Sequence, residues 1–95
     1  MRILVIEDEN EIREVLVANL EAIGMVAKGL SSGDHIINDL ETFQPDLMLL
    51  DQMMPGKSGQ EVIKDVRSST KYSKLPIIMV TGLSGEEQKV AALNS

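Results

Sequence analysis

Cysteine and tryptophan are absent from this sequence of 95 residues, and its only aromatic residues are Phe43 and Tyr72. Without cysteine the chain cannot form a disulfide framework or a thiolate metal site. So few aromatic side chains exclude a base-stacking platform for single-stranded nucleic acid. No apolar run approaches the ~20 residues needed to span a bilayer, and the opening stretch is too short for a signal peptide. We therefore expect a cytoplasmic protein that does not enter a membrane.

The composition is that of one globular domain with an acidic balance of charge. Hydrophobic residues make up 43% of the sequence, an ordinary share for a chain that must bury a small core. A net charge of −6 argues against non-specific binding to nucleic acid. It favours a cation or a partner with a basic face. We expect a single domain over residues 1–95.

Four short apolar runs alternate with helical patterns along the chain. They predict buried strands at residues 2–6, 25–30, 47–50 and 77–80. The second run is the most mixed in composition and suits the edge of a sheet. Four successive βα units call for a parallel, right-handed, three-layer α/β sheet.

Helices are predicted after these runs from their end signals and their apolar spacing. Asn10 is expected to cap the first helix, and Gly24 to follow its end in the left-handed conformation. Ser31 with Asp34 is expected to open the second, and Pro45 marks its end. Capping boxes open the third helix, over residues 59–68, and a last helix from residue 84. The side chains expected to face the core are Ile12, Val15, Leu16, Leu20 and Ile23, then Ile36, Ile37, Leu40 and Phe43, and then Val62, Ile63 and Val66.

Asp51 comes directly after the unbroken apolar run of residues 47–50. Its carboxylate is therefore expected where a buried strand leaves the core, and ligands bind at that edge of open α/β sheets. Residues 54–56, Met-Pro-Gly, then predict a constrained turn. By itself this stretch fits two interpretations equally: an acid placed for chemistry, or an acid that merely ends the strand.

Other strand ends also carry reactive groups. Glu7 and Asp8 follow the first strand, and Thr81 follows the fourth. If the first strand lies beside the third, three carboxylates converge, and their mutual repulsion requires a cation. Mg²⁺ fits best, because it takes oxygen ligands and leaves room for a phosphate oxygen. A carboxylate beside Mg²⁺ is a plausible nucleophile toward phosphorus, and Thr81 could hold another phosphoryl oxygen.

Three blocks of the sequence together resemble the receiver domain of two-component response regulators. They are Ile-Leu-Val-Ile-Glu-Asp-Glu at 3–9, Asp-Gln-Met-Met-Pro-Gly-Lys-Ser-Gly at 51–59, and Pro-Ile-Ile-Met-Val-Thr at 76–81. The resemblance covers the whole chain and implies a flavodoxin-like fold with strand order 2-1-3-4.

The resemblance also implies roles for individual residues. By it, Asp51 accepts a phosphoryl group from a phosphohistidine on a sensor histidine kinase or a phosphotransfer protein. Glu7 and Asp8 look like the acidic pair that binds Mg²⁺ together with Asp51, with the backbone carbonyl of Met53 as a further ligand. Thr81 looks like the switch hydroxyl, and Gly82 stands where a small residue leaves phosphorus accessible. The family acts as a phosphoacceptor and not as an enzyme in the usual sense.

The sequence departs from the family pattern at its end. The family continues into a fifth strand, which carries a lysine that pairs with the phosphoryl group. Lys89 is on the wrong element for that role, and Lys57 follows a turn. We therefore expect the fifth βα unit to be absent and the fourth strand to have an open, apolar edge. Such an edge predicts a homodimer or a strand-exchanged oligomer.

Two alternatives to a phosphoacceptor stay open at this point. The chain could be a non-signalling interaction or folding fragment of a receiver domain, with its acidic site unused. It could also be a Mg²⁺-dependent phosphohydrolase with an aspartyl nucleophile. Such enzymes usually have a second acid two residues after the nucleophile, a position that Met53 occupies here.

Overall fold

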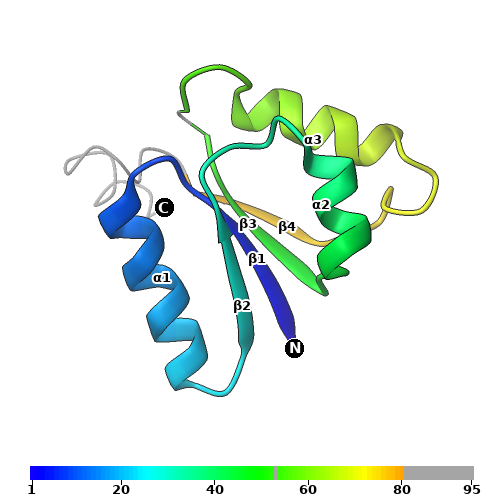
Figure 1. Cartoon of the computed structure of the whole chain (residues 1–95). Coiled ribbons are helices and arrows are strands. Elements are labelled where there is room, and N and C mark those ends of the chain that lie inside the picture. The colour runs from blue at the N-terminus through cyan, green and yellow to red at the C-terminus, as the bar shows by residue number, and fades with distance from the viewer. Residues whose placement is uncertain (53, 81–95) are drawn as a thin grey trace.

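The computed structural model describes residues 1–52 and 54–80, which form an α/β sandwich (Figure 1). The predicted strands and their parallel order are confirmed: the sheet runs β2-β1-β3-β4. Its elements in chain order are β1 (Arg2–Ile6), α1 (Asn10–Ala22), β2 (Val26–Leu30), α2 (Ile36–Phe43), β3 (Leu47–Asp51), α3 (Gly59–Ser68) and β4 (Ile77–Val80). None of these helices has both the length and the apolarity to cross a bilayer.

The register of the central strands brings two loops to the same edge. Ile6 pairs with Leu50 across β1 and β3, so the residues that follow each of them lie at one level. On the far side of β3, Asp51 pairs with Val80 of β4. The carboxyl ends of β1, β3 and β4 therefore meet at one edge of the sheet.

The helices lie on both faces of this sheet, with α1 on one side and α2 and α3 on the other (Figure 1). Because side chains alternate along a strand, Leu4, Ile6, Met48 and Leu50 share the face covered by α2 and α3. Their helical partners in the core are Ile36, Leu40, Phe43, Val62 and Val66, with Tyr72 from the loop after α3. This is the main hydrophobic core.

The sequence signals that mark helix ends are confirmed where the residues involved are close together in the sequence. Ser58 Oγ accepts from the Glu61 N–H, and the Glu61 carboxylate accepts from the Ser58 N–H, which completes the capping box of α3. Gly24 follows α1 with φ of +91°, a left-handed conformation that suits glycine.

Two predicted caps are wrong. The residue that precedes α1 is Glu9, whose carbonyl accepts from the Arg13 N–H, and Asn10 is already helical. The side-chain oxygen of Asn10 accepts from the Arg13 guanidinium. The residue that precedes α2 is His35, with no side-chain cap among the described atoms. Ser31 lies too far before the start of α2 to cap it, because the chain first passes close to α3 at Gly33. A Cβ on Gly33 would lie 2.3 Å from Val62 Cγ2.

The apolar faces predicted for α2 and α3 are confirmed in part. The face predicted for α1 is the least well confirmed. Ile36, Leu40, Phe43, Val62 and Val66 are buried, whereas Ile37 is exposed. No residue of α1, all of which the structure describes, is fully buried. Val15 is 58% and Ile23 69% exposed. In β4, Ile78 is 50% exposed, so the predicted cover on both faces of that strand is wrong for this residue. The predicted helix from residue 84 lies outside the described residues.

Candidate metal site at the carboxyl edge of the sheet

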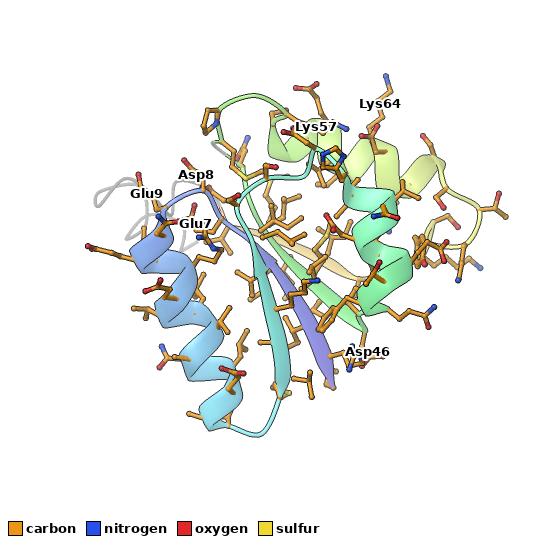
Figure 2. All side chains as sticks on the ribbon, viewed as in Figure 1. Glu7, Asp8, Glu9, Asp46, Lys57 and Lys64 are labelled. Carbon is orange, nitrogen blue, oxygen red and sulfur yellow. The ribbon has the colours of Figure 1, made fainter. Side chains whose placement is uncertain are left out.

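Three carboxylates converge where β1 and β3 end, as the sequence predicts. Glu7, Asp8 and Asp51 each offer one oxygen, and these three oxygens lie within 4.8 Å of one another. Glu7 and Asp51 are fully buried, and Asp8 is partly exposed. Figure 2 shows Glu7 and Asp8 together in the loop between β1 and α1. The site thus has two buried members and one that reaches solvent.

Asp51 is held by the tight junction between β3 and α3. The Gly59 N–H donates to the Gln52 carbonyl at 3.2 Å, so α3 begins directly against the end of the strand. A Cβ on Gly59 would lie 2.8 Å from the Asp51 carbonyl oxygen and 2.9 Å from Gln52 Cα, both backbone atoms that cannot easily move. Glycine at this position lets the helix approach the acid so closely. The sequence analysis placed Gly59 at the start of a helix and in the block that resembles the family, but did not predict this close approach.

Glu7 is held by hydrogen bonds to both neighbouring segments. Its N–H donates to the Leu30 carbonyl of β2 at 3.0 Å, which extends the sheet by one residue. Its Oε2 accepts from the Glu9 N–H at 3.2 Å, so the loop folds back on the side chain. The Glu7 carboxyl group therefore stays inside the cluster and does not turn toward solvent.

The electrostatics of the cluster favour a bound cation. Glu7 Oε1 and Asp8 Oδ1 are buried oxygen atoms without a hydrogen-bond partner among the described residues. Burial, followed by the close approach of the Asp8 and Asp51 carboxyl groups, raises the pKa of Glu7 to about 8. At neutral pH the cluster without a cation therefore favours a bound proton. A hard divalent ion such as Mg²⁺ fits these carboxylate oxygens and would displace that proton.

The other predicted site residues fall outside this cluster or outside the described chain. Met53, Thr81 and Gly82 lie outside the described residues. Lys57 forms an ion pair with Asp65 of α3, and this contact raises the pKa of the Lys57 ammonium group. The sequence analysis did not assign Lys57 the role of pairing with the phosphoryl group, and this ion pair is compatible with that prediction. Arg13, which the sequence analysis did not single out, lies close to the site, since its Nη1 donates to the Glu7 carbonyl.

Comparison with known proteins gives consistent matches. The family model of the response regulator receiver domain matches residues 3–95. The phosphate regulon transcriptional regulatory protein PhoB of Escherichia coli K12 is 38% identical over 94 residues, which are 99% of this chain and 41% of that protein. BaeR, a transcriptional regulatory protein of another E. coli strain, is 34% identical over 92 residues, 97% of this chain and 37% of that protein. The chain thus spans about two fifths of these relatives.

Solved structures match over nearly the whole chain. The BeF3-activated receiver domain of Klebsiella pneumoniae RstA has a TM-score of 0.78 and 29% identity, and the match covers 99% of this chain and 78% of that one. The response regulator TrrA of Thermotoga maritima, solved in complex with Mg²⁺ and beryllium fluoride, has a TM-score of 0.76 and 32% identity, over 99% and 80% of the two chains.

Proposed function

The chain belongs to the response regulator receiver domain family, and from this membership we propose that Asp51 is its phosphoacceptor. A receiver domain accepts phosphoryl groups in two-component signal transduction. The observation that carries the assignment to Asp51 is its place in the cluster: it is the buried carboxylate at the end of β3, within 4.8 Å of Glu7 and Asp8.

The reaction that we propose is a transfer of one phosphoryl group. A carboxylate oxygen of Asp51 forms a bond to phosphorus while the bond between phosphorus and the donor histidine nitrogen breaks. The imidazole keeps the electron pair of the broken bond, and the product is an aspartyl phosphate. We propose a phosphoacceptor that at most assists its own phosphorylation and dephosphorylation, and not an enzyme with a separate substrate.

We further propose that Glu7, Asp8 and Asp51, with the Met53 carbonyl, hold Mg²⁺ during this transfer. The ion would neutralise charge on the phosphoryl oxygens. The buried oxygens of Glu7 and Asp8 that lack partners support this proposal, and so does the Mg²⁺ complex of the TrrA relative. Without the ion, the raised pKa of Glu7 favours its protonated form at neutral pH, so Mg²⁺ binding competes with that proton.

Thr81 is proposed as the switch hydroxyl, with Gly82 leaving the approach to phosphorus open. The support comes from the register of the sheet and from the order of the sequence. Val80 pairs with Asp51, and Thr81 is the next residue of the chain.

For partners, we propose a sensor histidine kinase or a phosphotransfer protein, with no direct contact to nucleic acid through this domain. The net charge of −6 is unfavourable for the phosphate backbone of DNA. The curated relatives are transcriptional regulators of more than twice this length, so the output of the whole protein is likewise a proposal. We propose a cytoplasmic location, because the phosphoryl groups of such donors derive from ATP.

Phosphorylation by a small-molecule donor tests the proposed function. We expect acetyl phosphate with MgCl₂ to add one phosphoryl group, seen by intact-protein mass spectrometry and removed by hydroxylamine, which cleaves acyl phosphates. Asp51→Asn should remain unlabelled, whereas Asp65→Asn, a change on α3 outside the cluster, should be labelled as the wild type is. Labelling of Asp51→Asn at the wild-type rate would contradict the assignment.

We also propose that copies of the chain associate through the edge of β4. Within the described residues, β4 pairs only with β3, and Ile78 on this strand is half exposed. An open apolar strand edge is a template for pairing with a second chain. Sedimentation velocity at micromolar concentration should show a dimer, and Ile78→Lys should shift it toward monomer. A compact monomer that melts cooperatively would rule this association out.

A further inference from the structure

We propose that Arg13 of α1 is a positioning residue of the acidic site, holding the segment that carries Glu7 and Asp8 in its cation-binding geometry. The proposal rests on the proposed metal site and adds a residue that does not touch the metal. Its evidence is a set of contacts between Arg13, the loop after β1 and strand β2.

The guanidinium of Arg13 spans the loop that carries the acids. Nη1 donates to the Glu7 carbonyl at 2.7 Å, and Nη2 donates to the side-chain oxygen of Asn10. One planar group therefore ties the last residue before Asp8 to the first residue of α1. The loop between these two anchors contains only Asp8 and Glu9.

The contact to the Glu7 carbonyl fixes more than that single atom. The carbonyl of Glu7 and the N–H of Asp8 belong to the same planar peptide group. Holding the carbonyl at Arg13 therefore sets the orientation of the peptide from which the Asp8 side chain projects. Since the Glu7 N–H is already bound to Leu30, both peptide groups of Glu7 are held.

Gly29 of β2 makes room for the side chain of Arg13. A Cβ on Gly29 would lie 2.8 Å from Arg13 Cγ and 2.9 Å from Cδ, closer than such atoms approach. Glycine inside a strand lowers its stability and often marks a close approach by another group. Here that group is the aliphatic part of Arg13, which crosses β2 on its way to the loop.

The partners of Arg13 distinguish it from an ordinary surface cation. The chain has 15 acidic residues, yet neither ion pair formed by the described residues involves Arg13. Both of its acceptors are neutral oxygens, at either end of the acidic loop. Such contacts shape the backbone and leave the carboxylates available for a cation. Outer-shell groups of this kind orient ligands before the metal binds.

Arg67 offers a matched control at the other end of the molecule. Its Nη1 donates to the carbonyls of Ser73 and Leu75, at 3.1 and 2.7 Å, in the loop between α3 and β4. It therefore makes the same type of contact, from a helix to a neighbouring loop, without reaching the acidic cluster. If Arg13 acts only by tightening the fold, the two arginines should be equivalent in a metal-binding assay.

The experiment is an NMR titration of backbone amide signals with MgCl₂ on the whole chain. We expect Arg13→Met, which keeps the aliphatic part and removes the donors, to weaken Mg²⁺ binding by roughly 10- to 100-fold. Gly29→Ala should weaken it in the same direction by displacing Arg13, with the guanidinium still present. Arg13→Lys should recover part of the affinity, because one donor can still reach the Glu7 carbonyl. Arg67→Met should bind Mg²⁺ as the wild type does.

Asp8→Ala separates the failure of this inference from failure of the proposed metal site. If Asp8→Ala loses Mg²⁺ binding while Arg13→Met and Gly29→Ala retain wild-type affinity, the positioning role is wrong and the metal site stands. Equal losses in Arg13→Met and Arg67→Met would also overturn it, as a general loosening of the fold. If Asp8→Ala binds Mg²⁺ normally, the metal site is wrong and the role of Arg13 falls with it.

Discussion

The two edges of the sheet treat their charged residues in opposite ways. At the amino edge, Arg2 and Asp46 bind one another reciprocally: the Arg2 N–H donates to Asp46 Oδ2, and the Asp46 N–H to the Arg2 carbonyl, both at 2.7 Å. Arg2 Nε donates to the Phe43 carbonyl at 2.9 Å, and the Arg2 guanidinium lies 4.3 Å from the centre of the Phe43 ring. The Asp46 carboxylate thus accepts from a backbone N–H, and the Arg2 guanidinium donates to a carbonyl.

At the carboxyl edge the acidic residues gather side by side, and two of them, Glu7 and Asp51, are buried. Figure 2 shows Glu7, Asp8 and Glu9 at this end, and Asp46 at the other. Glu7 is fully buried yet has an oxygen without a hydrogen-bond partner among the described residues. The amino edge therefore closes the fold, whereas the carboxyl edge lowers its stability until a cation binds. Stability and function are assigned to opposite ends of the same strands.

The largest expected difference between the edges is in phosphorylation. Asp8→Ala should abolish Mg²⁺-dependent labelling by acetyl phosphate, because it removes a metal ligand from the site. Asp46→Ala, an aspartate replaced at the amino edge, should be labelled at the wild-type rate. Mass spectrometry over a time course measures both. Unchanged labelling of Asp8→Ala would remove the metal role that we assign to this residue.

The next effect is on the pH dependence of stability without Mg²⁺. Because the pKa of Glu7 rises from 4.5 to about 8 on folding, the folded state binds more protons than the unfolded state between these values. Its contribution to the free energy of unfolding therefore falls as pH rises through this window, by at most roughly 1 kcal/mol per pH unit. Glu7→Gln should flatten this slope, as measured by urea unfolding at both ends of the window.

A control for this pH effect is the addition of Mg²⁺. Saturating Mg²⁺ should stabilise the wild type most at the high end of the window, where the proton no longer competes for Glu7. If Glu7→Gln and wild type show parallel pH profiles, burial of Glu7 does not raise its pKa as described.

The smallest effect is expected at the amino edge. Asp46→Ala removes the acceptor for the Arg2 N–H and should cost about 1 kcal/mol of unfolding free energy, the usual net value of one hydrogen bond. Urea unfolding measures this loss, and an NMR titration of the same variant should show unaltered Mg²⁺ binding. A loss of Mg²⁺ affinity in Asp46→Ala would mean that the two edges are coupled.

Much of the fold could be predicted from the sequence, because its signals are local. The apolar runs predicted the strands. The capping box at Ser58 and Glu61 predicted the start of α3, since both residues lie within one helical turn. The convergence of Glu7, Asp8 and Asp51 required one further fact, the adjacency of β1 and β3. The family resemblance implied that adjacency, and the sheet order confirms it.

The remaining features depend on which distant group a side chain meets. Asn10 is a residue type that often caps helices, but here it is helical, and its side-chain oxygen accepts from Arg13. Gly33 and Gly59 look like ordinary turn and cap residues until a neighbouring element is placed within 3 Å of their missing Cβ atoms. The exposure of Val15 and Ile78 likewise reflects what lies beside α1 and β4, which periodicity does not specify.

The sheet order also has a consequence for the order of folding events. β1 is the first strand of the chain but lies between β2 and β3, and its contact with Asp46 spans 44 residues. Local pairing with β2 can form early, whereas closing the longer loop carries a greater entropic cost. During synthesis, Glu7 and Asp8 therefore emerge well before the strand that gathers them with Asp51. The repulsion between these two acids and Asp51 is absent until β3 docks. The acidic site forms only once β1 is paired with both β2 and β3.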